Sequence, residues 1–287
     1  MTKPKIIACD LDGTLFYPKQ HKKYVSKKNI AFLRKFIDAG NRVVLVTSRS
    51  EPFVKKVIKE IERPVDYIAS TGCKISVEGE LIQHKFIDNE KLKVILDDVA
   101  RDYNPLGFLV SSAKYPVLIC SNRDVNRMIM SFYGKWYRFY FGFYREDFVY
   151  DNDIFDKEVK DGEVYGAKIF FGVRRKKNKI SKEINKRLRE KYPDIEASWA
   201  GIAIELTPSG CNKANSIETY IDYLHASPEN VYVVGDSGND ISMFMKFNEN
   251  SFVMSHAYPS VKKYAKHEIS RVYQLDKYVF GKENNDE

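Results

Sequence analysis

Residues that can carry out chemistry follow three short apolar runs of this 287-residue sequence, at the point where each run ends. The first run ends at Asp10, the second at Thr47-Ser48-Arg49 and the third at Gly235-Asp236. In a parallel sheet the carboxyl ends of the strands lie along one edge, and ligands of open α/β sheets bind just beyond that edge. Two carboxylates and a pair of hydroxyl groups are therefore expected to converge in one crevice, which indicates an active site.

The runs that position these residues are Ile6–Cys9, Val43–Val46 and Val231–Val234. Each is unbroken and rich in β-branched residues, which is typical of parallel strands covered on both faces. Between the first two runs, apolar residues at helical spacing lie between Ser26, a predicted N-cap, and Gly40, a predicted stop. A second helix is predicted from Ser50 and Pro52 onward. This alternation of strands and helices predicts a doubly wound α/β domain.

The alternation changes after a predicted hairpin with Glu78-Gly79 at its turn. The following residues predict an α+β unit with helices near 89–103 and 124–132, strands near 108–110, 117–120 and 168–173, a basic helix at 174–191, and two strands ending at Leu206. The earlier pattern returns after Asn212. We therefore predict a core formed by residues 1–84 and 209–287, interrupted by an inserted domain at residues 85–208.

Four segments resemble the motifs of the haloacid dehalogenase superfamily, in the order in which that superfamily has them. Asp10-Leu11-Asp12-Gly13-Thr14-Leu15 resembles the first motif, and Thr47-Ser48-Arg49 resembles the second. Lys213 resembles the third, and Gly235-Asp236-Ser237-Gly238-Asn239-Asp240 is similar to the fourth. The size and position of the insert most resemble the Cof-type branch, subfamily IIB, which carries a large α/β cap.

The resemblance implies a nucleophile and a metal site. Asp10 is the expected nucleophile, and its attack on a phosphate dianion requires that negative charge be neutralised. The implied neutraliser is Mg²⁺, held by the carboxylates of Asp10 and Asp236, the backbone carbonyl of Asp12 and waters. Asp12, two residues after the nucleophile, is expected to protonate the departing alcohol and then to deprotonate the attacking water.

The resemblance also implies contacts to the phosphate. Lys213 supplies a cation to both Asp10 and the phosphate, while the hydroxyl group of Thr47 and the backbone amide of Ser48 bind phosphoryl oxygens. Asn239 and Asp240 orient the phosphate or the waters of the metal. The sequence departs from the usual pattern at three places: Ser48 replaces Gly, Thr71-Gly72-Cys73 replaces Asn-Gly-Ala, and His256 replaces Asn.

The expected function is hydrolysis of small phosphate monoesters through an aspartyl-phosphate. The partner is then a small phosphorylated metabolite, such as a sugar phosphate or a phosphorylated cofactor, and the inserted domain is expected to choose the leaving group. One alternative is a phosphomutase, which needs the same residues. Another is a non-catalytic protein that uses its basic helix to bind a polyanion. The sequence leaves the oligomeric state open.

The net charge of +8 would be compatible with a nucleic-acid partner, but its distribution disfavours one. Residues 174–191 hold ten Lys or Arg against two acids, an excess equal to that of the whole chain. Ile180, Ile184 and Leu188 recur there at a spacing of four, which predicts a helix with a narrow buried stripe and a solvated basic face. The aromatic run at 132–144 is interpreted as part of buried cap strands or helix faces rather than as a nucleic-acid site, with the alternative that some of its side chains line the substrate pocket.

Bulk composition indicates a globular protein with no membrane partner. No apolar run approaches the roughly 18 residues that cross a bilayer, and no secretion signal is recognised at Met1–Lys5. The four cysteines form no CxxC pair, so that neither a zinc site nor a disulfide framework is predicted. A reduced, cytoplasmic setting is expected from this cysteine usage.

Overall fold

The computed structural model describes residues 4–121, 142–171, 175–200 and 203–281. The chain divides into two compact units. The core unit comprises Met1–Gln83 and Lys213–Glu287, and the cap unit comprises His84–Asn212. Within the described ranges no helix is both long and apolar enough to cross a membrane.

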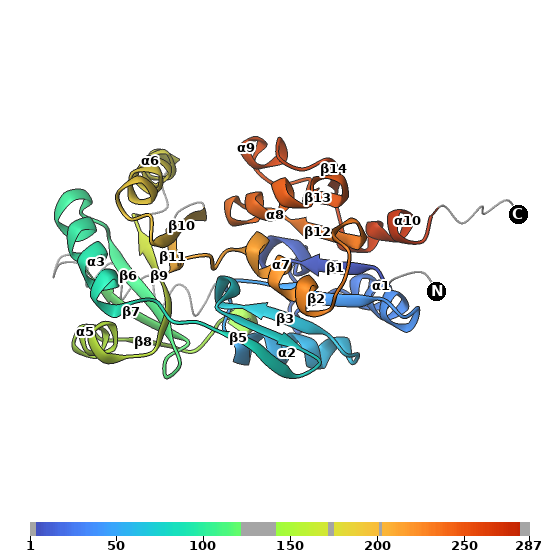
Figure 1. Ribbon diagram of the computed structural model, residues 1–287, viewed down its shortest axis with the longest axis horizontal. Helices are drawn as coiled ribbons and strands as arrows, with labels where there is room; N and C mark the ends of the chain where they lie inside the picture. Colours follow the sequence, from blue (N-terminus) through green and yellow to red (C-terminus); the bar gives the residue numbers. More distant parts are fainter. Residues whose placement is uncertain (1–3, 122–141, 172–174, 201–202, 282–287) are drawn as a thin grey trace, which may run out of the picture. The chain divides into compact units, whose positions relative to one another are not determined.

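The core unit is built on one mainly parallel sheet with the strand order β14-β13-β12-β1-β2-β3-β4-β5 (Figure 1). Strand β1 lies at its centre, paired in parallel with β12 and β2, and only the β3–β4 pairing and the β4–β5 hairpin depart from this direction. The strands are β1 (Ile6–Cys9), β2 (Arg42–Val46), β3 (Asp66–Ala69), β4 (Lys74–Val77), β5 (Glu80–His84), β12 (Val231–Gly235), β13 (Ser251–Met254) and β14 (His267–Ile269). The three strands and the hairpin predicted from the sequence are confirmed.

Helices cover both faces of this sheet. On one face α7 (Lys213–Tyr223), α8 (Ile241–Lys246) and α9 (Pro259–Lys262) bury alternate strand residues such as Ala8 and Val44. On the other face α1 (Lys27–Asp38) and α2 (Glu51–Ile61) contact β2 and β3, and the short α10 (Asp276–Val279) follows near the end of the chain. The side chain of Ser26 accepts a hydrogen bond from the N–H of Asn29, which confirms the predicted N-cap of α1.

The cap unit contains a six-stranded sheet of order β10-β11-β9-β6-β7-β8, in which only the β7–β8 pair is parallel. Its strands are β6 (Gly107–Ser112), β7 (Val117–Ser121), β8 (Phe148–Tyr150), β9 (Val164–Phe170), β10 (Ile195–Ala200) and β11 (Ala203–Pro208). The helices α3 (Asn89–Tyr103), α5 (Asn152–Asp161) and α6 (Arg175–Lys191) lie along one side of it (Figure 1). The apolar core between sheet and helices includes Leu92, Phe108 and Leu188.

Several cap elements differ from the sequence prediction. Helix α5 and strand β8 were not predicted, and β9 begins at Val164 rather than near Lys168. The buried stripe of α6 is shorter than predicted. Ile184 and Leu188 are buried, whereas Ile180, the first apolar residue of the helix, is 45% exposed and points toward solvent. The predicted helix at 124–132 lies outside the described residues, as does most of the aromatic run at 132–144.

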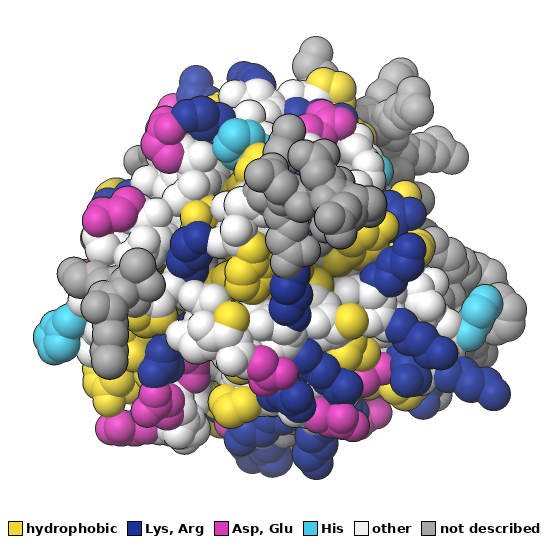
Figure 2. All heavy atoms as spheres, turned by 90° about the vertical axis from the view of Figure 1, so that its right-hand side faces the viewer, with side chains coloured by type: hydrophobic (Ala, Val, Ile, Leu, Met, Phe, Trp, Pro, Cys, Tyr) yellow, Lys and Arg dark blue, Asp and Glu magenta, His cyan; other side chains and the backbone are white. Residues whose placement is uncertain are grey.

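Basic side chains are not confined to α6. Residues 16–63 of the core unit hold thirteen Lys or Arg against four Asp or Glu. Three of these acids form ion pairs, and Glu60 accepts the backbone N–H groups of Tyr24 and Val25. Figure 2 shows Lys and Arg side chains gathered along the lower edge of one face. The positive charge of the chain is therefore spread over both units.

Candidate active site

The turn after β1 brings Asp10 to the carboxyl edge of the core sheet. The N–H of Asp10 continues the strand pairing by donating to the carbonyl of Val234, at 3.0 Å. The chain then turns tightly through Leu11–Leu15, with Gly13 at a φ of +80°. A Cβ atom at Gly13 would lie 2.3 Å from Oδ2 of Asp236. Only glycine both adopts this backbone conformation readily and leaves room for that carboxylate.

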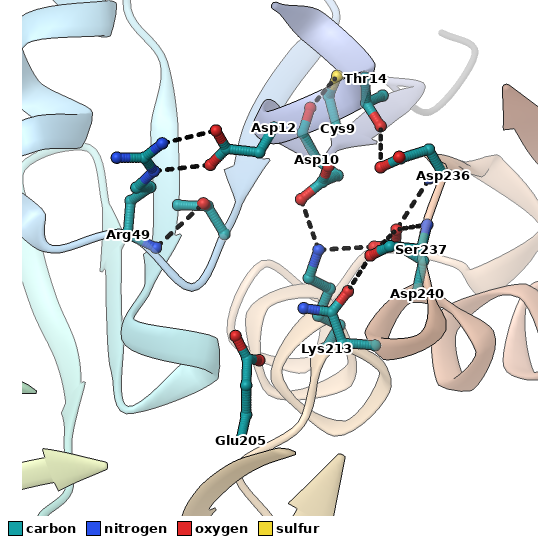
Figure 3. Close-up of polar contacts among 12 residues, drawn as sticks. Cys9, Asp10, Asp12, Thr14, Arg49, Glu205, Lys213, Asp236, Ser237 and Asp240 are labelled. Carbon is teal, nitrogen blue, oxygen red and sulfur yellow. Dashed lines mark hydrogen bonds and ion pairs between the residues drawn. The ribbon is translucent and has the colours of Figure 1, made fainter. Parts of the chain in front are cut away.

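Lys213, the first residue of α7, joins two of the acids (Figure 3). Its Nζ atom lies 2.6 Å from Oδ1 of Asp10 and 2.6 Å from Oδ1 of Asp240. All three side chains are buried. Burial lowers the pKa of Lys213, but the charges of Asp10 and Asp240 and the hydrogen bonds to them outweigh this effect and raise the pKa above its usual value. The lysine is therefore a fixed positive charge beside Asp10.

The loop after β12 carries both Asp236 and Asp240, and the side chain of Asp240 binds the backbone of this loop. Oδ2 of Asp240 accepts the backbone N–H groups of Asp236, at 2.9 Å, and Ser237, at 2.8 Å. A Cβ atom at Gly235 would lie 2.4 Å from the carboxyl carbon of Asp240, so glycine is needed at the strand end. Oδ1 of Asp236 accepts a hydrogen bond of 3.3 Å from the hydroxyl group of Thr14. The two motif loops are thus tied together through Asp236.

The acids of this cluster outnumber its cations. Asp10, Asp236 and Asp240 each offer an oxygen within 4.8 Å of the others, and Lys213 is the ammonium group that pairs with two of them. Burial raises the pKa of Asp10 well above its usual value; Lys213 lowers it, and Asp240 and Asp236 raise it. Burial likewise raises the pKa of Asp236. Three carboxylates with one lysine suit a divalent cation, which would offset the remaining negative charge.

Arg49 lies on the other side of Asp10 and holds Asp12. Its Nε and Nη2 atoms lie 2.6 Å from Oδ2 and 2.6 Å from Oδ1 of Asp12. The guanidinium group is buried against the ring of Phe53, with 4.6 Å between its central carbon and the ring centroid. The backbone N–H of Arg49 donates to the hydroxyl group of Thr47, at 3.1 Å. In Figure 3 the carboxylate of Asp12 therefore points toward Arg49 and away from Asp10.

Comparison with known proteins shows to which family the chain belongs. A model of the haloacid dehalogenase-like hydrolase family matches residues 7–276. The chain belongs to this family. The match extends through both parts of the core and the whole cap unit, and it confirms the family membership that the four motifs predicted.

Two curated relatives of this haloacid dehalogenase-like hydrolase match along most of its length. An uncharacterised Mycoplasma capricolum protein is 24% identical over 94% of this chain and 98% of its own. The 5-amino-6-(5-phospho-D-ribitylamino)uracil phosphatase YwtE of Bacillus subtilis is 26% identical over 84% of each chain.

Solved structures confirm the fold prediction. A haloacid dehalogenase-like hydrolase from B. subtilis superimposes with a TM-score of 0.74 at 22% identity, over 96% of this chain and 99% of that one. The subclass IIB sugar phosphatase BT4131 gives a TM-score of 0.74 at 20% identity, over 96% and 99%. The chain therefore has the α/β fold of these hydrolases, with a mainly parallel core sheet and a largely antiparallel cap sheet.

The structure brings four of the predicted site residues into one cluster, and the other predicted residues make their contacts outside it. Asp10, Lys213, Asp236 and Asp240 form one cluster. Asp12 and Thr47 both contact Arg49 instead. The half-buried Ser48 lies next to Thr47, and the side-chain oxygen of Asn239 accepts a hydrogen bond of 2.7 Å from Ser237.

Sequence reasoning gave no role to Arg49 or to His256, whose Nε2 atom lies 3.7 Å from Oδ2 of Asp236. The signal for Arg49 was its place in the second motif, directly after Thr47 and Ser48. The signal for His256 was its departure from the family pattern. Neither signal states which acid the side chain contacts, because that depends on how the loops meet.

Proposed function

We propose that this hydrolase is a magnesium-dependent phosphatase that removes phosphate from small phosphate monoesters through an aspartyl-phosphate on Asp10. The observation that carries the proposal is the buried contact of Lys213 with both Asp10 and Asp240, inside a cluster of three carboxylates. A phosphate dianion can approach a carboxylate nucleophile only where positive charge surrounds both groups. Lys213 supplies one such charge.

The remaining charge is assigned to Mg²⁺. The carboxylates of Asp10 and Asp236 and the backbone carbonyl of Asp12 would hold the ion, which neutralises phosphoryl charge when bound. Asp240 would not need to be a ligand, since its two oxygens are already engaged by Lys213 and by the N–H groups of Asp236 and Ser237.

Asp10 is the nucleophile of the first step. Its carboxylate oxygen forms a bond to phosphorus while the bond from phosphorus to the leaving oxygen breaks. Asp12 gives its proton to that oxygen, so that a neutral alcohol departs. Because Asp12 is paired with Arg49, the proton transfer requires that substrate binding first separate this pair and that Asp12 take up a proton from water.

The second step regenerates Asp10. Water attacks phosphorus, its proton goes to Asp12, and the bond between phosphorus and the Asp10 oxygen breaks to release inorganic phosphate. The hydroxyl group of Thr47, the amide of Ser48, Asn239 and the ammonium of Lys213 are proposed to bind phosphoryl oxygens in both steps.

The substrate class is proposed by analogy with named relatives. Two B. subtilis relatives, YwtE and YcsE, are 5-amino-6-(5-phospho-D-ribitylamino)uracil phosphatases, and BT4131 is a sugar phosphatase. We therefore propose a sugar phosphate, a sugar-alcohol phosphate or a phosphorylated cofactor as substrate. Residues 85–208 are assigned the choice of leaving group, since the clustered acids and Lys213 come from outside that segment.

A screen of phosphorylated metabolites in the presence of Mg²⁺, with released phosphate as the readout, tests the proposal. Sugar and sugar-alcohol phosphates should be hydrolysed, and Asp10→Asn protein purified in parallel should release none. Transfer of the phosphoryl group to a second sugar hydroxyl, without free phosphate, would instead indicate a phosphomutase.

A further inference from the structure

We propose that His256 is a positioning residue that holds the carboxylate of Asp236 in the orientation needed to bind a divalent cation. This inference rests on the proposed metal dependence. Nε2 of His256 lies 3.7 Å from Oδ2 of Asp236, while the hydroxyl group of Thr14 donates to Oδ1 of the same carboxylate. Asp236 is therefore approached by a different side chain at each of its two oxygens.

The sheet brings His256 to this place. Asp236 directly follows β12, and His256 follows β13, which pairs in parallel with β12. The turn is fixed by two backbone hydrogen bonds, from Ser255 to Ile269 and from Ala257 to Met254. His256 therefore reaches Asp236 from the neighbouring strand end of the same sheet edge.

An aromatic stack fixes the imidazole ring. The rings of His256 and Tyr17 lie 4.0 Å apart at an angle of 32°, and the guanidinium carbon of Arg271 lies 4.8 Å from the centroid of Tyr17 on its ring face. The N–H of Tyr17 in turn donates to the carbonyl of Thr14. Both groups that approach Asp236 are thus anchored to the loop that follows Asp10.

The contact has a physical consequence for cation binding. A separation of 3.7 Å is longer than a hydrogen bond, so the imidazole ring acts on Asp236 electrostatically and, by its position beside Oδ2, limits the rotations of the carboxylate. A ligand group that is already oriented loses less conformational freedom when the ion binds. Outer partners of metal ligands typically contribute about 10- to 100-fold to metal affinity.

The length of the side chain at position 256 determines which substitutions should preserve the contact with Asp236. The interacting atom is Nε2, at the far end of the imidazole ring, and a glutamine places its amide nitrogen at a comparable distance from the backbone. Asparagine is shorter by one methylene group and places its amide nearer to the position of Nδ1. Gln at position 256 is therefore expected to preserve the effect of His256 on cation binding, whereas Asn and Ala are not.

The experiment measures Mn²⁺ binding by electron paramagnetic resonance, with Mg²⁺ as competitor and without substrate. His256→Ala should weaken binding by about tenfold or more, His256→Gln should restore most of the affinity, and His256→Asn should not. Tyr17→Leu, which removes the stacked ring, should also weaken binding, and the matched Tyr17→Phe, which keeps the ring, should bind as the parent protein does. Thermal unfolding in chelator should be similar for all five variants.

Three outcomes would overturn the inference. Unchanged Mn²⁺ affinity in His256→Ala, with reduced turnover, would mean that His256 acts on the substrate. Equal weakening in His256→Gln and His256→Ala, with a lower unfolding temperature, would mean that the ring only packs. If the parent protein itself binds no divalent cation, the proposed metal dependence fails first and this inference fails with it.

Discussion

Asp12 and Arg49 form a two-pronged ion pair, with both nitrogen–oxygen distances at 2.6 Å. The arginine is the buried partner, since its side chain is 9% exposed and that of Asp12 is 43% exposed. A buried guanidinium fork favours the ionised form of a carboxylate and fixes its direction. The proposed general acid therefore faces Arg49 in the resting protein, and it must leave this partner and hold a proton before it can serve a leaving group.

Arg49→Gln tests whether this pair positions Asp12. We expect turnover of a sugar phosphate to fall by about 10- to 100-fold because Asp12 loses the partner that holds it at the site until the substrate binds, while p-nitrophenyl phosphate, whose leaving group needs little protonation, is affected less. Arg49→Lys keeps the charge but not the fork and should lie between. Equal losses for both substrates would show instead that Arg49 contacts the phosphoryl group.

Asp12→Ala tests the proton transfer itself. General acid catalysis is typically worth about 10² to 10⁴ in rate, so the rapid-mixing burst of alcohol release should slow by that order for a sugar phosphate. The burst of p-nitrophenolate should slow far less. The burst is the right readout because the hydrolysis of the aspartyl-phosphate is common to both substrates and can mask the difference at steady state. Equal slowing would remove the acid role from Asp12.

The convergence of the acids could be predicted from the sequence because strand ends in a parallel sheet share one edge. Asp10 and Asp236 follow β1 and β12, which are hydrogen-bonded neighbours in the sheet. The contact of Asp12 with Arg49 could not be predicted in this way. It depends on the path of two irregular loops and on the packing of Arg49 against Phe53, neither of which has a periodic sequence signal.

The cap shows the limits of periodicity more plainly. Helix α5 has three apolar residues in ten, of which Phe155 and Val159 are buried and Ile154 is partly buried. So few apolar residues give too weak a pattern to identify a helix. Its start is marked by Asp151, whose side chain accepts the N–H of Ile154, but an isolated Asp is equally common in turns. In α6 the spacing of Ile180 matched the stripe, yet this side chain is exposed to solvent.

Removal of divalent cations tests the charge balance of the acid cluster. In excess chelator phosphate release should stop, and added Mg²⁺ should restore it, because Lys213 alone leaves three carboxylates facing a phosphate dianion. The protein should remain folded in chelator, as judged by circular dichroism. Activity that persists undiminished after exhaustive chelation would refute the metal assignment.

Glu51, in the first turn of α2, should contribute to stability in a pH-dependent way. Burial raises its pKa, but hydrogen bonds from Lys55, Lys74 and Tyr67 outweigh this and hold the pKa at about 2. Because the folded-state pKa lies below the unfolded value, the stabilisation is present above about pH 4.5 and is lost as the pH falls toward 2.

Urea unfolding between pH 6 and pH 3 measures this contribution. The free energy of unfolding should fall more steeply with decreasing pH in the parent protein than in Glu51→Gln. Glu249→Gln is the matched control, since Glu249 pairs with Lys266 on the surface with its side chain 80% exposed and solvent screens the pair. A Glu51→Gln profile parallel to that of the parent would show that these hydrogen bonds do not persist in solution.

The central claim is that the phosphoryl group passes through Asp10, and the most direct measurement is to trap it there. A single turnover with a ³²P-labelled sugar phosphate, quenched with acid and digested, should place transient label on the peptide that contains Asp10, and borohydride reduction should convert that residue to homoserine. Asp10→Asn protein should take up no label. The account predicts that the label appears before inorganic phosphate is released and decays as phosphate forms. Label on another residue, or phosphate release with no labelled protein at any time during the turnover, would contradict it.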